Sequence, residues 1–422
     1  MIRIVIMPTT IVALTFVAWW YFTRQPDSLK KFYWPSLILK IGAGMLVGIV
    51  YFNYYGIGDT IGYWQDGNLL AEEIISDPVS GINFFLGDTP SAVKGLVNDR
   101  PRSIFFVKIV AILSIICGGN YWVMDAVISF ISFLGAWYIF RKTTSFFPES
   151  TCASSIAFLF FPSVIFWSSG LIKESMGLTA VFFLSGFFLM IITNQKVHWW
   201  EWIVALISVW VGWNLKYYWI GIFIPVAIST VIVAKLKIKF DLLRKFEIIT
   251  WIGVFVLVLS IGTSVHPNFY PSRFLEVLVQ NNEDLNSHSK PGNLVHYDSL
   301  APTVVSILTN APQALIAGLF RPFIWEQHNI LSLLAAVENF IFMLLLFTAL
   351  PRMLHILKSP YRLITISVIT YTIILAVFLA LSSPNFGTLS RYKIGFLPLI
   401  VFVLIYRNPV IYWWNSRNLL DR

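Results

Sequence analysis

The chain has 422 residues, of which 57% are hydrophobic and only 12% are charged, and its mean hydropathy is +0.74. Soluble domains carry about 25% charged residues, so a soluble fold could not cover this much apolar surface. We interpret the excess of 30 Lys and Arg over 21 Asp and Glu as charge that sets membrane topology, and no nucleic-acid partner is expected.

Eleven apolar runs are long enough to be membrane spans, which need about 20 helical residues to cross about 30 Å of hydrocarbon. The sequence therefore predicts an all-α polytopic membrane protein with a single transmembrane domain, residues 1–422. In chain order the predicted spans are Ile4 to Phe22, Ser36 to Tyr55, Tyr121 to Phe140, Ser150 to Trp167, Ser175 to Ile192, Trp199 to Leu215, Trp219 to Ala234, Glu247 to Ser264, Ile330 to Leu350, Ile364 to Leu381 and Ile394 to Tyr406.

Gly44 and Gly48 in the second span have the small-residue spacing that lets two helices approach closely. The spans are expected to carry almost no charge in mid-helix. That pattern favours an enzyme over a transporter, because transporters tend to place charged residues within their spans.

The run from Ile104 to Cys117 is apolar but too short for a span, and it contains Lys108. If it does not cross, the basic clusters of the other loops fall on one side of the membrane, which the positive-inside rule assigns to the cytoplasm. We therefore predict the N-terminus outside, the C-terminus inside, and an amphipathic helix, Ser103 to Cys117, on the outer face. The outer loops are then 56–120, 168–174, 265–329 and 382–393.

The first outer loop opens with Gly58-Asp59-Thr60 and reaches Tyr63. A carboxylate where a helix leaves the bilayer needs a partner or a function. Asp59 is either part of a polar helix end or a general base in a partly desolvated opening.

The segment Pro162 to Ser175, which includes the second outer loop, breaks the helical pattern with Pro, Ser and Gly and carries Lys173 and Glu174. An ammonium group at a helix N-terminus suits a phosphate. The alternative for Lys173 is an interfacial lysine that extends its charged end to water.

Several other cations lie on the predicted outer face, where the charge rule does not place them. They suit oxyanion recognition of a phosphodiester or diphosphate, and the alternative is that they form structural ion pairs with outer carboxylates. These residues are Lys216, Arg273, Arg321, Arg391 and Lys393.

The long outer loop contains an apolar portion, Ala301 to Leu319, which we expect to form a helix lying over the outer surface. Neither paired Cys nor a His-Glu-x-x-His motif is present, so a catalytic zinc is not expected. The pattern leaves room for a divalent cation held by Asp59 and phosphate oxygens.

The order of these features resembles the GT-C superfamily of polytopic glycosyltransferases, which use polyprenyl-phosphate-linked sugars. Asp59-x-x-x-Tyr63 opens the first large outer loop, the helix from Ser103 to Cys117 follows, Pro162 to Glu174 forms the short second loop, and Arg391-Tyr392 with Pro398 begins a late span. The resemblance implies that Asp59 is the catalytic base and Arg391 a ligand of the lipid phosphate. Lys173 and Glu174 occupy a loop that often carries functional residues, and Tyr63 and Tyr392 accompany these motifs as substrate contacts.

The chain departs from that family in its extra leading span and in having Gly58-Asp59-Thr60 where a paired Asp-Glu is usual. O-antigen and exopolysaccharide polymerases and ligases are therefore an alternative. These enzymes depend on arginines of the outer face, and the candidate residues here are Arg273, Arg321 and Arg391.

We expect a bacterial inner-membrane enzyme that moves a sugar from a polyprenyl-phosphate or diphosphate donor to a saccharide or lipid-linked acceptor on the outer face. A transporter or flippase for a lipid-linked sugar is the alternative from another functional class.

Overall fold

The computed structural model describes residues 2–87, 95–265, 270–289, 291–326, 329–356 and 358–410. Parts of the predicted outer loops 56–120 and 265–329 lie outside these ranges. Within them the regular structure is helical, and one isolated bridge joins Leu294 and Asn385. The described part of the chain is thus all-α, as expected.

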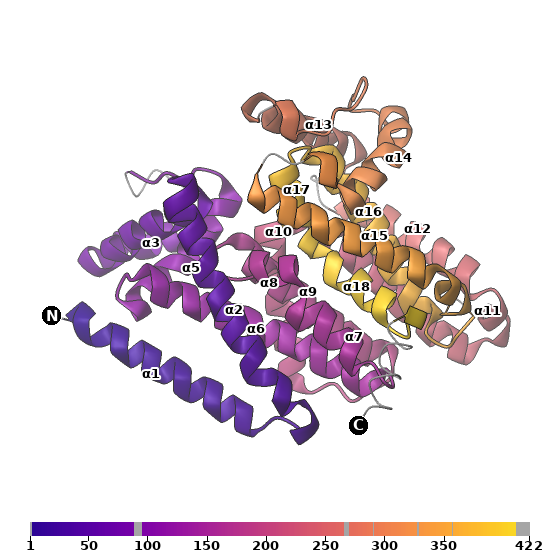
Figure 1. Cartoon of the computed structure of the whole chain (residues 1–422), viewed down its shortest axis with the longest axis horizontal. Helices are drawn as coiled ribbons and strands as arrows, with labels where there is room; N and C mark the ends of the chain where they lie inside the picture. Colours follow the sequence, from indigo (N-terminus) through magenta and orange to yellow (C-terminus); the bar gives the residue numbers. More distant parts are fainter. Residues whose placement is uncertain are drawn as a thin grey trace. The chain divides into compact units, whose positions relative to one another are not determined.

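The helices follow one another in this order (Figure 1): α1 Ile2–Thr23, α2 Asp27–Val50, η1 Tyr51–Tyr55, α3 Asp59–Ser76, α4 Pro78–Leu86, α5 Pro101–Cys117, α6 Tyr121–Phe146, α7 Thr151–Ser155, η3 Ile156–Phe160, α8 Pro162–Trp167, α9 Lys173–Ile192, α10 Trp199–Lys239, α11 Asp241–Lys245, α12 Glu247–Val265, α13 Pro271–His288, η5 Pro291–Asn293, α14 Val304–Phe320, η6 Ile324–Glu326, α15 Ile330–Ile356, α16 Arg362–Ser382, α17 Phe386–Tyr392, η7 Lys393–Gly395 and α18 Leu397–Ile405.

Eight helices among the described residues are long and apolar enough to cross a membrane, or nine if a bent pair near the C-terminus is one span. The bent pair is Phe386–Gly395 followed by Leu397–Ile405, with an angle of 65°. The eleven predicted spans are therefore not all shown. The predicted span Ser150 to Trp167 is divided at Phe161, whose backbone is extended, because the residue before a proline disfavours the helical conformation. Two other predicted spans are joined in α10, which has 41 residues and one non-helical position, Lys216.

The chain divides into two compact units. Unit 1 comprises residues 1–139, 164–184 and 203–217, and unit 2 comprises 140–163, 185–202 and 218–422. Each unit is therefore discontinuous in sequence, and α6, α9 and α10 contribute residues to both.

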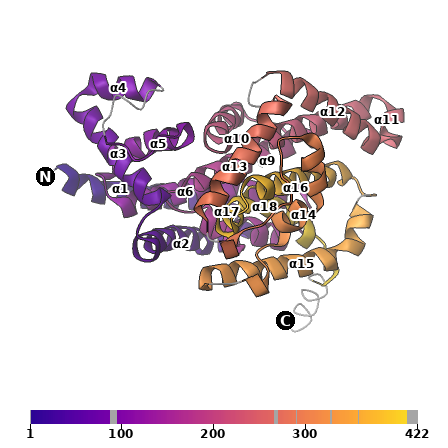
Figure 2. The ribbon, with the colours of Figure 1, turned by 90° about the horizontal axis from the view of Figure 1, so that it is seen from above.

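In unit 1, α3 packs against α4 and α5, and α1 also contacts α5 (Figure 2). The buried positions of α3 recur every three or four residues and include Tyr63, Asp66 and Leu70, which is the period of a helix with one buried face. The short apolar run of the sequence does form a helix, α5. Its exposed side also carries apolar residues, Ile112, Ile115 and Ile116, so α5 is apolar on both faces and the expected amphipathic pattern is absent.

The two glycines of α2 allow close packing against α6, as predicted. A Cβ at Gly48 would lie 2.7 Å from a ring carbon of Tyr121 and 2.9 Å from one of Trp122. A Cβ at Gly44 would lie 2.6 Å from Oδ2 of Asp125. Only glycine fits at either position without displacing its neighbours.

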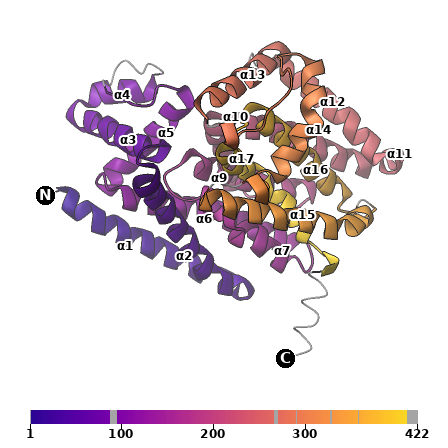
Figure 3. The ribbon, with the colours of Figure 1, turned by 45° about the horizontal axis from the view of Figure 1, so that its top comes forward.

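In unit 2, α13 and α14 both pack on α16 (Figure 3). The apolar portion Ala301 to Leu319 forms the expected helix, α14, with Thr303 accepting a hydrogen bond from the backbone N–H of Ser306 at 3.2 Å. A Cβ at Gly318 would lie 2.3 Å from the carbonyl oxygen of Ala376, so α14 approaches the backbone of α16 closely. The predicted outer segments are thus mostly helical.

Candidate functional site

Two of the predicted site residues pair with each other at the start of α9. Glu174 is fully buried, and its Oε1 accepts from Nζ of Lys216 at 2.5 Å, with the two side chains 0% and 3% exposed. Lys216 is the residue whose backbone interrupts α10, with φ −141° and ψ 59°. Each charge neutralises the other, and removing either would leave the other buried and uncompensated. This arrangement agrees with the alternative that the predicted outer cations form structural ion pairs. Because Glu174 is buried in the pair, its carboxylate is not exposed to solvent.

Lys173 occupies a different environment one residue earlier. It is half-buried, donates from Nζ to Oγ of Ser103 at 3.1 Å, and lies 5.1 Å from the centre of the Tyr63 ring. Tyr63 is buried and also packs edge-to-face on Phe106. Its ring therefore contacts the ammonium group through a cation–π interaction, and the Tyr63 side chain is 1% exposed.

A second cation lies at the start of the neighbouring helix. The guanidinium of Arg102, at the beginning of α5, is 5.3 Å from the centre of the Tyr217 ring. Arg102 and Lys173 thus stand in the first turns of α5 and α9, where free backbone N–H groups add positive potential. Because Lys173 also contacts Ser103 of α5, the two helix starts form one basic region in unit 1.

Asp59 is the first residue of α3 and is exposed. The sequence left open a polar helix end or a general base in a partly desolvated opening, and the exposed position agrees with the polar helix end. Gly58, with φ 142°, immediately precedes it. One helical turn separates Asp59 from Tyr63, whose ring contacts Lys173. A surface carboxylate and a half-buried cation therefore lie near the same end of α3.

The turn that leads into Lys173 is held by side chains that the sequence analysis missed. Asp125 Oδ1 accepts from the N–H of Leu171 at 3.1 Å, and Ser129 Oγ accepts from the N–H of Gly170 at 2.9 Å. Ser132 donates to the carbonyl of Ser168 at 2.6 Å. These three side chains of α6 fix the backbone between α8 and α9, so they position the segment that carries Lys173 and Glu174.

Lys40 of α2 donates to the hydroxyl of Ser168 in the same turn and is only 4% exposed. Lys40, Asp125 and Glu338 all lie within predicted spans, so the expectation that the spans carry almost no mid-helix charge is wrong. The sequence could have indicated these residues. Placing an ionisable side chain inside an apolar segment costs free energy, so such a residue is a candidate for function.

A second group of predicted residues lies in unit 2. Lys393 is 2% exposed and donates to the carbonyl of Arg321 at 3.1 Å and to Oδ1 of Asn339 at 2.8 Å. Arg321 forms an ion pair with Glu326 at 3.1 Å, both partly buried. The pairing of Arg321 with an acid agrees with the structural alternative for that residue.

Arg391 is 8% exposed and belongs to α17. The ring of Tyr392, the next residue, lies 6.2 Å from that of Tyr218. Arg273, by contrast, is exposed on α13 and pairs loosely with Glu276 at 3.4 Å, which is a common surface pair one helical turn apart.

The predicted residues thus form two groups. Unit 1 holds Asp59, Tyr63, Lys173, Glu174 and Lys216, and unit 2 holds Arg273, Arg321, Arg391, Tyr392 and Lys393. Within the described part of the chain, no cluster of three or more His, Cys, Asp or Glu side chains could hold a metal ion. The basic region of unit 1 is the candidate site, because it combines cations, helix starts and an exposed carboxylate.

Comparisons of the chain with protein-family models, with curated proteins and with solved structures found no match.

Proposed function

We propose that the protein is a membrane glycosyltransferase that moves a sugar from a polyprenyl-phosphate or diphosphate donor to a hydroxyl acceptor on the outer face of a bacterial inner membrane. The observation that carries the proposal is the basic region of unit 1, where Lys173 and Arg102 stand at two helix starts. Asp59, exposed at the start of α3, supplies a carboxylate near this region.

The chemistry assigns one task to each group. The acceptor hydroxyl gives its proton to the Asp59 carboxylate while its oxygen forms a bond to the anomeric carbon of the donor. The bond between that carbon and the phosphate oxygen breaks, and its electron pair goes to the phosphate. Lys173 and Arg102 stabilise the charge that develops there, which is the largest contribution expected in a site of low dielectric.

Arg391 belongs to unit 2, so its role as a ligand of the lipid phosphate is a separate part of the proposal. It is tested by Arg391→Lys, which keeps the charge and removes the bidentate geometry. A phosphate contact through both guanidinium nitrogens predicts a raised KM for the lipid donor in this variant, and an unchanged KM removes Arg391 from the proposal.

The test uses the purified protein in lipid nanodiscs with a polyprenyl-linked sugar labelled in the sugar, and it measures released polyprenyl phosphate together with labelled product. Lys173→Met is expected to abolish release and Lys173→Arg to retain part of it, because the cation is what matters. Asp59→Asn is expected to lower the rate by about 10²- to 10⁴-fold. Glu72→Gln is the matched control, because it removes another exposed carboxylate of α3. Full activity in Asp59→Asn would remove Asp59 from the mechanism.

A polymerase or ligase of surface polysaccharides would give the same release of lipid phosphate, and the length of the labelled product separates it from a single-sugar transferase. A divalent cation enters the proposal only if chelation with EDTA lowers this activity.

A transporter or flippase for a lipid-linked sugar is the second candidate. It is favoured by the ionisable residues within apolar helices, the buried Lys40 and Asp125 and the partly buried Glu338, since such residues mark transport pathways in many membrane proteins. Movement of the labelled lipid between leaflets without release of lipid phosphate would favour this function over the transferase.

A further inference from the structure

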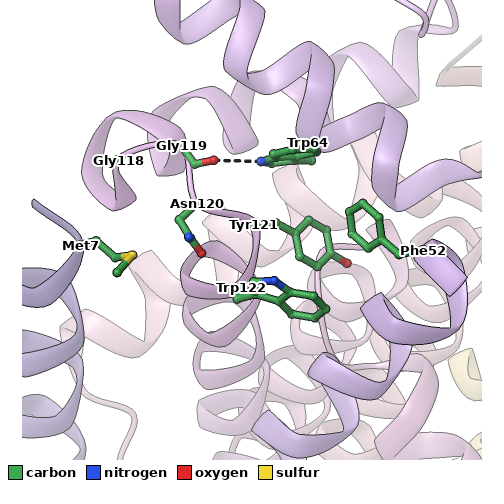
Figure 4. Close-up of a pocket in the computed structure, with 8 residues that line it drawn as sticks. All are labelled: Met7, Phe52, Trp64, Gly118, Gly119, Asn120, Tyr121 and Trp122. Carbon is green, nitrogen blue, oxygen red and sulfur yellow. Dashed lines mark hydrogen bonds between the residues drawn. The ribbon is translucent and has the colours of Figure 1, made fainter. Parts of the chain in front are cut away.

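An open pocket of about 460 Å³ lies in unit 1 beside the start of α6, within the roughly 300–1,000 Å³ of small-molecule sites. Figure 4 shows four aromatic rings on one side of it and Met7 with the Asn120 carboxamide on the other. Its lining residues are Met7, Phe52, Trp64, Gly118, Gly119, Asn120, Tyr121 and Trp122. None of them is ionisable near neutral pH, so the pocket suits an uncharged ligand.

The rings are fixed before any ligand arrives. Phe52 lies 4.9 Å from Tyr121 at 90°, and Tyr121 lies 5.0 Å from Trp122 at 85°. The Tyr121 hydroxyl shares a hydrogen bond with Thr60 at 2.8 Å, and the indole N–H of Trp64 donates to the carbonyl of Gly119 at 2.9 Å. Trp122 stays 40% exposed, so its indole is the ring that a ligand reaches most easily.

The opposite side of the pocket is partly polar. Gly118 and Gly119 both have positive φ, 66° and 74°, a conformation that other residues rarely adopt. Their N–H groups donate to the Ser114 carbonyl, and the Gly119 carbonyl accepts from Trp64 and Asn68, so the Asn120 carboxamide is the polar group that this side offers to a ligand. Asn120 accepts from the N–H of Val123 through Oδ1 at 3.2 Å, which leaves its Nδ2 to donate to a ligand.

We propose that this pocket binds a pyranose ring. A sugar has one face of C–H groups that packs on an aromatic ring and a rim of hydroxyls that hydrogen-bond to an amide such as that of Asn120. A lipid tail is disfavoured, because it would bury the Asn120 Nδ2 group without a partner. A phosphate is disfavoured because no cation lines the pocket.

This inference rests on the proposed function and names the subsite of the acceptor. The phosphate of the donor is expected to bind at Lys173 and Arg102, whereas no charged side chain lines the pocket. Through the bond between Thr60 and Tyr121, the pocket adjoins the first turn of α3, which begins with Asp59. A neutral sugar in the pocket therefore lies beside the proposed base.

The experiment is saturation-transfer difference NMR on the full protein in nanodiscs, with methyl β-D-glucopyranoside, methyl α-D-mannopyranoside and methyl β-D-galactopyranoside as probes. At least one probe is expected to receive saturation, strongest on the protons of one ring face. Trp122→Ala is expected to weaken binding about threefold to tenfold. Asn120→Asp is the second variant, because it keeps the acceptor for Val123 and removes the amide donor. Trp199→Ala is the control, since Trp199 is 76% exposed and outside the pocket.

The proposal is overturned if no probe receives saturation, or if both pocket variants bind as the wild type does. It is also overturned if geraniol, a short prenyl alcohol, is saturated in the wild type and not in Trp122→Ala while no sugar is. Release of polyprenyl phosphate without sugar binding would remove this pocket and leave the proposed function standing. Sugar binding without release would support the pocket and count against the transferase.

Discussion

Replacing Gly44 with alanine tests how α2, α6 and the turn before α9 fit together. The added Cβ would clash with Oγ of Ser129 and lie 2.6 Å from Oδ2 of Asp125 and 3.0 Å from the backbone nitrogen of Gly170. All three residues are buried. The hydrogen bond from the Gly170 N–H to Ser129 must therefore lengthen or break.

The expected cost comes from two sources. Overpacking a close-packed site costs about 1–3 kcal/mol, and leaving the buried N–H of Gly170 unsatisfied costs about 1–3 kcal/mol. Alanine gains about 1 kcal/mol over glycine in a helix. Gly42→Ala measures that gain alone, because a Cβ at Gly42 has no atom within 4 Å. The two variants should therefore differ by about 2–6 kcal/mol in the free energy of unfolding.

The assay is equilibrium unfolding in mixed micelles with increasing SDS, followed by tryptophan fluorescence, with the apparent melting temperature as a second measure. Gly44→Ala should unfold at lower SDS than the wild type, and Gly42→Ala at the same or higher SDS. Equal stability of the two alanine variants would show that α2 does not approach α6 and the Gly170 turn as closely as described.

Breaking the buried pair by Glu174→Gln should destabilise the protein by about 3–5 kcal/mol, and the double variant Glu174→Leu with Lys216→Met should recover most of this loss in the same SDS assay. Burial raises the pKa of the Cys117 thiol to about 11, so the reactive thiolate is about 0.1% of the total at pH 8. Maleimide should therefore label the half-buried Cys152 first, labelling of Cys117 should rise with pH up to about 11, and equal rates at pH 8 would contradict the burial. Asp66 accepts three hydrogen bonds from the chain before α5, so Asp66→Ala should speed amide hydrogen exchange in residues 97–98, and unchanged exchange there would refute the tether.

Hydropathy predicts much of this fold, because apolar length is what a bilayer selects. The predicted spans match both ends of α1 and α16 to within two residues. The predicted span from Tyr121 begins where α6 begins but ends at Phe140, before the end of α6 at Phe146. Hydropathy does not predict helix ends or interruptions that depend on a local backbone feature. Pro162 ends a helix inside an apolar run, and Lys216 interrupts α10 without ending it.

The candidate site was harder to predict, because sequence spacing does not tell which distant charges pair. Lys173 and Glu174 are neighbours in sequence, yet one contacts Ser103 and Tyr63 while the other pairs with Lys216. Asp59 was either a polar helix end or a base in a partly desolvated opening, and only the structure shows that its side chain is exposed. Asp125 accepts a hydrogen bond from the N–H of Leu171, 46 residues later in the sequence. Only the tertiary structure reveals that contact.

The buried pair between Glu174 and Lys216 also bears on how the chain enters the membrane during synthesis. Glu174 precedes Lys216 by 42 residues, and it lies at the first turn of α9, whereas Lys216 lies deep within α10. The carboxylate is therefore made before the lysine that needs it, and α9 offers a partner when α10 leaves the ribosome. The pair can therefore form only once α10 has been made.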